Sequence, residues 1–441
     1  MKNSDYQFNN NAMKMILLDA WILSLIIFSS NLKGQDSYSS VHTIDIGDNV
    51  KKMQKIYLSQ FADSISYISL EFSQEFPVGV IRSLSFFDNY ILVNDFKSCL
   101  LYDREGHFIR NIGKNGRGPG EYQFLTCSRL YKDKIYVQSV FDLFEYEIDG
   151  TFIGKTKNRF MFNNNTYQYS RNWININDSL IFSHMPNPTG NIPYKALLSG
   201  NEGKIFKTYK NYILFFRGKP ISITDDNAHI YQFKQMIFFK EYYNDTLYCL
   251  DSQFNLLPKY VFKLGKYKEP LSNREKSIAE MGKSEANYIF IPEIFQNDNY
   301  LFIKCKYGNH FPAKRLTPET VKLPTGNIST KWYNTKFVLG VYNKHTKQIS
   351  FCEPTSTDNA LFTSGIYNDI DAGPRFFPDI QVNDSTLVMM IKPSDLIKHT
   401  ESDDFKNILP SNNSNKKKLE DLANKIKDLD NPVLMFVRLK K

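Results

Sequence analysis

The sequence predicts an all-β fold in which a cluster of short strands is repeated around a ring. Two segments carry the same order of apolar residues and turns: Val93 and Val137 are 44 residues apart, and so are Gly106 and Gly150. Aromatic residues make up 15% of the chain, mostly Phe and Tyr, which favour strands. A period of about 40–50 residues with several strands in each copy is typical of β-propeller blades.

A glycine-rich segment, residues 113–122, separates these two copies. Its glycines allow tight turns, Pro119 fixes φ, and Tyr122 is suited to packing between blades. Two interpretations stay open: a connector between blades, or a nest of backbone N–H groups that binds an anion. We favour the connector, because no helix pattern follows that would add a positive N-terminus. The segment lacks the Gly-Lys-Ser/Thr ending of a nucleotide-binding loop.

Four short motifs follow one another in a characteristic order. They are Gly-Arg-Gly-Pro-Gly-Glu-Tyr at 116–122, Asn-Asp-Thr-Leu-Tyr at 244–248, Asn-Asp-Ile-Asp at 368–371 and Asn-Pro-Val at 431–433. In this order they resemble a secreted bacterial family of six-bladed β-propellers with NHL-like repeats. The resemblance implies six four-stranded antiparallel blades in a single domain, residues 35–441, and it implies no known reaction.

The N-terminal segment predicts export. Lys14 precedes an apolar run at residues 20–28, which is short for a membrane span of about 20 residues and is typical of a signal peptide. We predict a signal peptide at residues 1–34, with Met13 as an alternative start; a retained anchor helix is the other interpretation. No cysteine follows the run to carry a lipid. We expect a periplasmic, cell-surface or extracellular protein with no integral membrane span after cleavage.

Charge and cysteine content narrow the possible functions. The formal charge of +9 is modest for 441 residues, and the lysines are scattered, so we predict no nucleic-acid partner. The five cysteines form no Cys-x-x-Cys pair, and their odd number leaves at least one unpaired. One disulfide between distant strands stays open.

The pattern of strands and turns sets the expected order of blades. We place them at about residues 81–112, 130–155, 174–209, 221–264, 297–342 with an interruption, and 377–391. Two early strands, 41–46 and 65–70, precede the first blade, and the last strand, 433–439, is expected to complete a blade begun by the other end of the chain. We expect surface loops at residues 159–173 and 310–330.

Two helices are expected outside the blades. Ser272 and Glu275 have the spacing of a capping box for a short helix that continues through Met281. Nearer the C-terminus, apolar residues recur every three or four positions, which predicts a helix ended by the Asn-Pro pair at 431–432. These residues are Leu419, Leu422, Ile426 and Leu429.

We find no sequence pattern for catalysis, and we predict neither a metal nor a cofactor. The seven histidines are scattered, and no Gly-x-Ser-x-Gly motif is present. Residues 369–373 resemble half of a calcium loop, but Ile380 stands where a bidentate glutamate would be needed. We favour a polar turn there.

Ligands of propellers usually bind at the mouth of the central channel, where loops converge. Our candidate binding residues are Arg117 and Glu121 at the first blade junction, and Asp371 and Arg375 before the sixth blade. Each is a charged residue in a glycine-bearing turn. The alternative for each is a surface ion pair or an acceptor for turn amides.

Three functions follow as hypotheses. The first is a secreted binding module that recognises a glycan, peptide or protein at the channel mouth or the insertions. The second is a hydrolase or lyase, metal-dependent or metal-independent, with its site in the central channel. The third is a scaffold that docks partners through residues 159–173 or 310–330.

Overall fold

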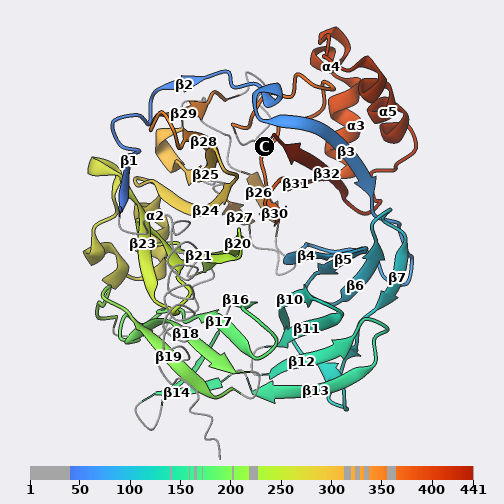
Figure 1. The fold of residues 1–441 in the computed structure, drawn as a ribbon. Coiled ribbons are helices and arrows are strands. Elements are labelled where there is room, and N and C mark those ends of the chain that lie inside the picture. Colours follow the sequence, from blue (N-terminus) through green and yellow to red (C-terminus); the bar gives the residue numbers. More distant parts are fainter. Residues whose placement is uncertain are drawn as a thin grey trace, which may run out of the picture. The chain divides into compact units, whose positions relative to one another are not determined.

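The computed structural model describes residues 40–139, 142–157, 159–162, 166–170, 172–200, 203–217, 227–311, 319–322, 328–331, 337–354 and 364–440. The chain divides into two compact units, Met1–His42 and Thr43–Lys441. The predicted signal peptide, residues 1–34, lies outside the described residues. The second unit holds six sheets of four or five strands arranged around a common centre (Figure 1), which confirms the six-bladed β-propeller.

The first three sheets have four antiparallel strands each, in sequence order from the centre outward. The first contains β4 (Ser83–Phe87), β5 (Tyr90–Asn94), β6 (Cys99–Asp103) and β7 (Phe108–Asn111). The second contains β10 (Leu125–Tyr131), β11 (Lys134–Ser139), β12 (Asp142–Glu147) and β13 (Phe152–Lys157). The third contains β16 (Trp173–Asn175), β17 (Leu180–His184), β18 (Tyr194–Gly200) and β19 (Ile205–Lys210).

The other three sheets recruit strands from the start of the chain. The fourth contains β20 (Ala228–Phe233), β21 (Met236–Glu241), β22 (Thr246–Leu250), β23 (Leu256–Lys263) and β1 (His42–Asp45). The fifth contains β24 (Phe290–Gln296), β25 (Tyr300–Lys306), β28 (Phe337–Asn343), β29 (Ile349–Cys352) and β2 (Met53–Gln54). The sixth contains β30 (Ile380–Asn383), β31 (Thr386–Ile391), β32 (Val433–Leu439) and β3 (Ala62–Ser69).

These strands correct three details of the prediction. The fourth and fifth sheets have five strands rather than four, because β1 and β2 cover their outer edges and pair backbone groups that would otherwise face solvent. The fifth blade begins with β24, ahead of the expected start at Asn297. The expected loops contain short hairpin strands, β14 (Arg159–Phe162) with β15 (Thr166–Tyr169), and β26 (Glu319–Lys322) with β27 (Ile328–Lys331).

The ring closes where the two ends of the propeller meet, as predicted. β3 pairs antiparallel with β32, with Ile65 opposite Val437 and Tyr67 opposite Met435. The sixth sheet is therefore built from residues at both ends of the second unit, and this pairing leaves no open seam between the first and last blades.

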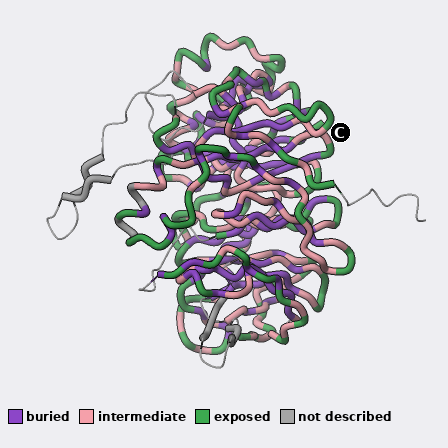
Figure 2. The backbone as a smooth tube through the Cα atoms, turned by 90° about the vertical axis from the view of Figure 1, so that its left-hand side faces the viewer, coloured by how far each residue is buried: buried purple, intermediate pink, exposed green. Residues whose placement is uncertain are grey.

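The core consists of contacts between neighbouring blades. The second strand of each blade is buried on both faces, so it appears in the sequence as a continuous apolar run, such as Ile91–Val93 in β5. Tyr122 is 1% exposed, packs among side chains of the first two sheets, and donates a hydrogen bond from its hydroxyl to the Ile112 carbonyl at 2.7 Å. The predicted packing of Tyr122 between two blades is confirmed. Figure 2 shows that buried segments concentrate in the strands and exposed ones in the turns.

The first predicted helix begins five residues later than expected. α2 (Ile278–Glu285) has its capping box at Ser277 and Glu280, whereas Leu271–Glu275 forms the 3-10 helix η4. Both pairs have the Ser-x-x-Glu spacing, so the local pattern alone could not separate them.

The C-terminal insertion contains three helices rather than one. α3 (Pro393–Glu401), α4 (Asp403–Asn407) and α5 (Asn413–Ala423) precede β32. Leu419 is buried inside α5, but Ile426 lies beyond its end, and Leu429 is 87% exposed. Leu419, Leu422 and Ile426 pack in the core cluster of the sixth sheet, whereas Leu429 does not, and the apolar spacing did not mark the end of the helix.

Candidate functional site

A cavity of about 650 Å³ opens between the fourth and fifth blades. Its walls come from the turn between β21 and β22, from the end of β23, from the first residues of β24, and from the connection that joins these two sheets. Successive antiparallel strands alternate in direction, so this turn and this connection emerge at the same end of the blades. The pocket therefore lies on the face that also carries the other connections between blades.

Arg274 stands at the inner end of this pocket and is only 5% exposed. Its guanidinium carbon lies 4.0 Å from the ring centroid of Tyr243 and 4.5 Å from that of Phe215. The backbone carbonyl of Arg274 accepts a hydrogen bond from the guanidinium of Arg217. Two aromatic rings and a second arginine therefore fix its position. Its buried Nε and Nη2 atoms donate no hydrogen bond within the described residues.

Glu269 is the acidic group of the pocket. Its Oε1 atom is buried and accepts no hydrogen bond from the described part of the chain. Burial and the nearby Glu285 carboxylate raise the pKa of Glu269 to about 7, although the Arg274 guanidinium acts in the opposite direction. An acidic and a basic side chain, each with unused hydrogen-bonding capacity, thus share one cavity.

Tyrosines support the wall behind these groups. The Tyr243 hydroxyl donates a hydrogen bond to Glu285 Oε1 at 2.7 Å, and burial raises the Tyr243 pKa well above its ordinary value. The Tyr242 ring stacks on Phe290 with the centroids 5.1 Å apart, and its hydroxyl accepts a hydrogen bond from Lys306 Nζ at 3.1 Å. These contacts make the wall rigid before any ligand arrives.

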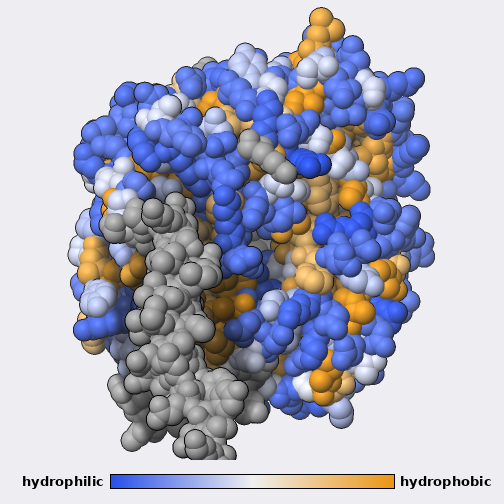
Figure 3. Space-filling model, viewed as in Figure 1, coloured by the Kyte–Doolittle hydropathy of each residue, from blue (hydrophilic) through white to orange (hydrophobic). Residues whose placement is uncertain are grey.

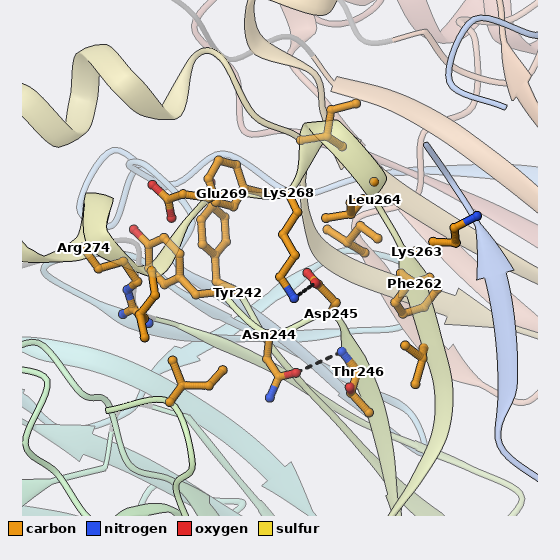
Figure 4. Close-up of a pocket in the computed structure, with 18 of the residues that line it drawn as sticks. Tyr242, Asn244, Asp245, Thr246, Phe262, Lys263, Leu264, Lys268, Glu269 and Arg274 are labelled. Carbon is orange, nitrogen blue, oxygen red and sulfur yellow. Dashed lines mark hydrogen bonds and ion pairs between the residues drawn. The ribbon is translucent and has the colours of Figure 1, made fainter. Parts of the chain in front are cut away.

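The outer part of the pocket is polar and more accessible. Lys268 Nζ lies 2.7 Å from Asp245 Oδ2. Figure 4 shows Lys268 extended toward Asp245, with Glu269 and Arg274 on the other side of the pocket. At the rim, Tyr212 is 78% exposed and offers an aromatic surface. On the face seen in Figure 3, hydrophobic residues occur in scattered groups among hydrophilic ones.

A second polar feature lies inside the blades. Near the end of the second strand, each of the first five sheets carries a buried polar side chain: Asn94, Gln138, His184, Lys240 and Lys304. Several of them reach the next blade. Gln138 Oε1 accepts a hydrogen bond from Trp173 Nε1 at 2.6 Å, and Lys304 forms ion pairs with Glu293 and Asp379. Burial lowers the pKa of Lys240 to about 8. We assign Gln138 and Lys304 to contacts between blades.

In the glycine-rich segment, residues 113–122, the Glu121 carboxylate is bound by groups of the same segment. Gly118 N–H donates a hydrogen bond to Glu121 Oε2 at 2.8 Å, and Lys114 Nζ lies 3.1 Å from Glu121 Oε1. These contacts lower the pKa of Glu121. Gly116 leaves the space that this carboxylate fills. The segment connects β7 to β10, as predicted, and Arg117 is exposed beside it.

The other two candidate residues lie before the sixth sheet. Asp371 is fully buried, and its Oδ1 atom accepts hydrogen bonds from Tyr67 hydroxyl at 3.2 Å, Asn368 Nδ2 at 2.7 Å and Gly373 N–H at 3.0 Å. Burial raises its pKa, and these hydrogen bonds oppose the shift. Arg375 donates a hydrogen bond to the Glu353 carbonyl at 2.9 Å.

The structure does not join the candidate residues into one site. Among the described residues, no hydrogen bond or ion pair links Arg117 or Glu121 to Asp371 or Arg375. Their roles in binding stay predictions. Across the described ranges, no group of three His, Cys, Asp or Glu side chains is placed to hold a metal ion. All five cysteines are free and buried, so the disulfide that the sequence left undecided is not formed.

Sequence analysis noted Asn244, Asp245 and Thr246 as part of a family motif but not as pocket residues, and it missed Arg274 and Glu269. Arg274 and Glu269 lie in the long connection between β23 and β24, which we had treated only as a place for a helix. The length of this connection, together with the paired Tyr242 and Tyr243 just before β22, was the available signal.

The fold and this pocket define a six-bladed β-propeller with a possible ligand site between two blades. The chain belongs to the DUF4934 family, described as a domain of unknown function, which matches residues 41–438. No curated protein matches the chain.

Two solved structures share the fold over most of their length. One is a Bacteroides fragilis protein described as a candidate exported protein, which is 16% identical, with a TM-score of 0.63 over 91% of this chain and 100% of the other. The second is a member of the DUF4221 family from Bacteroides vulgatus, 12% identical, with a TM-score of 0.50 over 86% of this chain and 97% of the other. At these identities the likeness shows the fold alone. No helix in the described part of the chain is long and apolar enough to cross a membrane.

Proposed function

We propose that the protein is an exported binding module whose ligand occupies the pocket between the fourth and fifth blades. One observation carries the proposal: a cavity of about 650 Å³ contains a buried guanidinium, Arg274, and a partly buried carboxyl, Glu269, with unused hydrogen-bonding atoms. This volume falls within the range of about 300–1,000 Å³ of small-molecule sites. Such sites combine apolar walls with a few convergent polar groups.

The fixed geometry of the pocket supports binding. Arg274 is held between Tyr243 and Phe215 before a ligand arrives, so little side-chain freedom would be lost on binding. The position differs from our expectation of a site at the mouth of the central channel, since the walls come from a turn and a connection at the blade junction.

A screen of the purified protein against immobilised glycans and a peptide library tests this function. Leu271 lines the pocket and is 43% exposed, so L271W would block the cavity without disturbing the core. Leu409 is 92% exposed and lies outside the pocket, so L409W is the matched control. We expect L271W to abolish binding of the selected ligand and L409W to preserve it. Binding that survives L271W would place the ligand elsewhere.

A hydrolase or lyase is the second candidate, and the raised pKa of Glu269 favours it. A carboxyl group with a pKa of about 7 can act as a general acid near neutral pH. For an enzyme, we expect conversion of the ligand by the wild-type protein, and no conversion by E269Q at a ligand concentration that saturates the variant. A ligand recovered intact from the wild-type protein would favour the binding module.

Export is part of the proposal and rests on the N-terminal segment. The apolar run at residues 20–28 after Lys14 supports a cleaved signal peptide at residues 1–34. N-terminal sequencing of the protein from a bacterial expression host, after separation of membrane and soluble fractions, tests it. An intact N-terminus in the membrane fraction would favour the retained anchor.

A further inference from the structure

The unused atoms of Arg274 and Glu269 restrict what the pocket can bind. The Nε and Nη2 atoms of Arg274 are donors, and Oε1 of Glu269 is an acceptor when ionised. Leaving buried polar groups without partners is costly, so a fitting ligand must supply an acceptor to one and a donor to the other. Both side chains line the same cavity, so one ligand can offer groups to both.

Hydroxyl groups meet this requirement better than carboxylates do. Each hydroxyl is both donor and acceptor, so two adjacent hydroxyls can accept from Arg274 and donate to Glu269. A ligand carboxylate would satisfy Arg274 but would repel the carboxylates of Glu269 and the nearby Glu285. A hydrocarbon group on the ligand would leave the unused atoms of Arg274 and Glu269 without hydrogen bonds.

The rim adds a surface for an apolar face. Tyr212 lines the pocket and is 78% exposed; Lys210 Nζ lies 5.2 Å from the ring centroid, which leaves the opposite face of the ring for stacking. A pyranose ring presents adjacent hydroxyls at its edge and C–H groups on its face. The arrangement of two charged groups inside and an exposed aromatic ring outside fits these two surfaces.

We propose that the pocket binds a carbohydrate, with one sugar hydroxyl accepting a hydrogen bond from Arg274, its neighbour donating one to Glu269, and the sugar face resting on Tyr212. This inference rests on the proposed function of the pocket and specifies its ligand class.

The test is an array of neutral and uronate-containing oligosaccharides, followed by calorimetry with the tightest neutral oligosaccharide at pH 8. We expect R274K and E269Q each to weaken binding about tenfold or more, because each removes a hydrogen bond to a charged group. Glu275 is exposed, belongs to the same 3-10 helix as Arg274 and does not line the pocket, so E275Q is the control and should stay within about twofold.

Tyr212 is exposed, so its substitution leaves the core intact, and a loss of binding in a Tyr212 variant is not explained by misfolding. Y212A should weaken binding about fivefold or more, and Y212F should match the wild-type protein, because stacking needs the ring and not the hydroxyl. Binding insensitive to R274K, E269Q and Y212A together would overturn the inference even if a glycan binds.

Two further outcomes separate this inference from the proposed function. If only peptides bind and L271W abolishes their binding, the carbohydrate class is wrong and the binding module stands. If E269Q strengthens binding of uronates, a carboxylate rather than a hydroxyl pair meets Arg274. If nothing in either collection binds, both proposals fail.

Discussion

The backbone N–H of Glu71 donates a hydrogen bond to the carbonyl of Gly106 at 2.8 Å. Glu71 follows β3 of the sixth sheet, and Gly106 forms the turn between β6 and β7 of the first. The Glu71 carboxylate also accepts a hydrogen bond from Phe108 N–H at 2.7 Å. The sheet that closes the ring is therefore fastened to the first blade through a turn of the repeat.

This contact predicts unequal effects of the same substitution at two equivalent glycines. A Cβ at Gly106 would lie 2.4 Å from the Ser69 carbonyl oxygen, whereas at Gly150 the nearest atom would be 3.5 Å away. Both residues have positive φ, which costs about 1–2 kcal/mol for alanine. We expect G150A to lower the free energy of unfolding by about that amount and G106A by about 3–5 kcal/mol, because of the added collision.

Denaturant unfolding of the two variants measures the difference. Gly150 lies 44 residues after Gly106 in the repeat, so G150A controls for the backbone term. Equal losses in both variants would mean that the backbone moves to relieve the collision with the Ser69 carbonyl and that the junction between the sixth and first sheets is not closely packed there.

A buried ion pair between the third and fourth sheets gives a second prediction. Lys195 Nζ lies 2.7 Å from Glu241 Oε2, and the side chains are 4% and 14% exposed. K195M leaves the Glu241 carboxylate without its cation in a low-dielectric site, so we expect a loss of about 3–5 kcal/mol in the free energy of unfolding. The double variant K195M/E241Q should lose less than K195M, because the unpaired charge is gone.

The exposed pair of Lys132 and Asp178 is the matched control. Its side chains are 54% and 68% exposed, so K132M should cost less than about 1 kcal/mol. A double-mutant cycle in denaturant measures the coupling. A K195M loss no larger than that of K132M would contradict a stabilising role for the buried pair.

The architecture could be predicted because equivalent residues of the first two blades are separated by a constant 44 residues. Val93 and Val137 have no exposed surface, and each lies in the second strand of its blade, as their spacing indicated. Pairing of the terminal strands followed from the need to cover sheet edges. The strand β1 was predicted at residues 41–46, but its place at the edge of the fourth sheet was not, and β2 has only two residues, which carry too little pattern to predict a strand.

The site could not be predicted in the same way. Arg274 meets Phe215 and Tyr243 from separate connections, so no linear spacing joins them. Charge in a glycine-bearing turn did not point to this pocket: Glu121 accepts a hydrogen bond within its own loop, and Asp371 accepts one within its own turn. A charged side chain becomes informative only when its partners are known.

The cysteines give a third prediction. Cys99, Cys127, Cys249, Cys305 and Cys352 are all free and buried. Burial raises the pKa of the Cys99 thiol to about 12, so almost no reactive thiolate forms at neutral pH. We expect a thiol reagent to label none of them in the native protein and all five in denaturant.

S411C supplies the positive control, because Ser411 is exposed and its thiol should react at once. We also expect the melting temperature to be the same with and without a reductant. Rapid native labelling of more than one wild-type thiol would show that the blade junctions open readily.

The last prediction concerns the pH dependence of stability caused by Glu269. The groups that face it are Glu285, Arg274, Asn273 and Lys276; the pKa of about 7 lies above the ordinary value of 4.5, first because of burial and then because of Glu285. The folded state therefore holds a proton that the unfolded state has lost between these two values. Stability linked to this carboxyl is fully present below pH 4.5 and falls as the pH rises through about 7.

The substitution E269Q replaces the Glu269 carboxyl with an amide that does not titrate in this pH range. Relative to the wild-type protein, E269Q should gain on the order of 1–3 kcal/mol in the free energy of unfolding between pH 4.5 and pH 8, after allowance for solvent screening of a partly exposed group. E275Q changes an exposed carboxyl in the same connection and should shift stability by less than about 0.5 kcal/mol at either pH. Denaturant unfolding at both pH values gives the comparison. A pH-independent difference for E269Q would show that this carboxyl has the same pKa in the folded and unfolded states, and the pocket would then be more hydrated than its buried oxygen indicates.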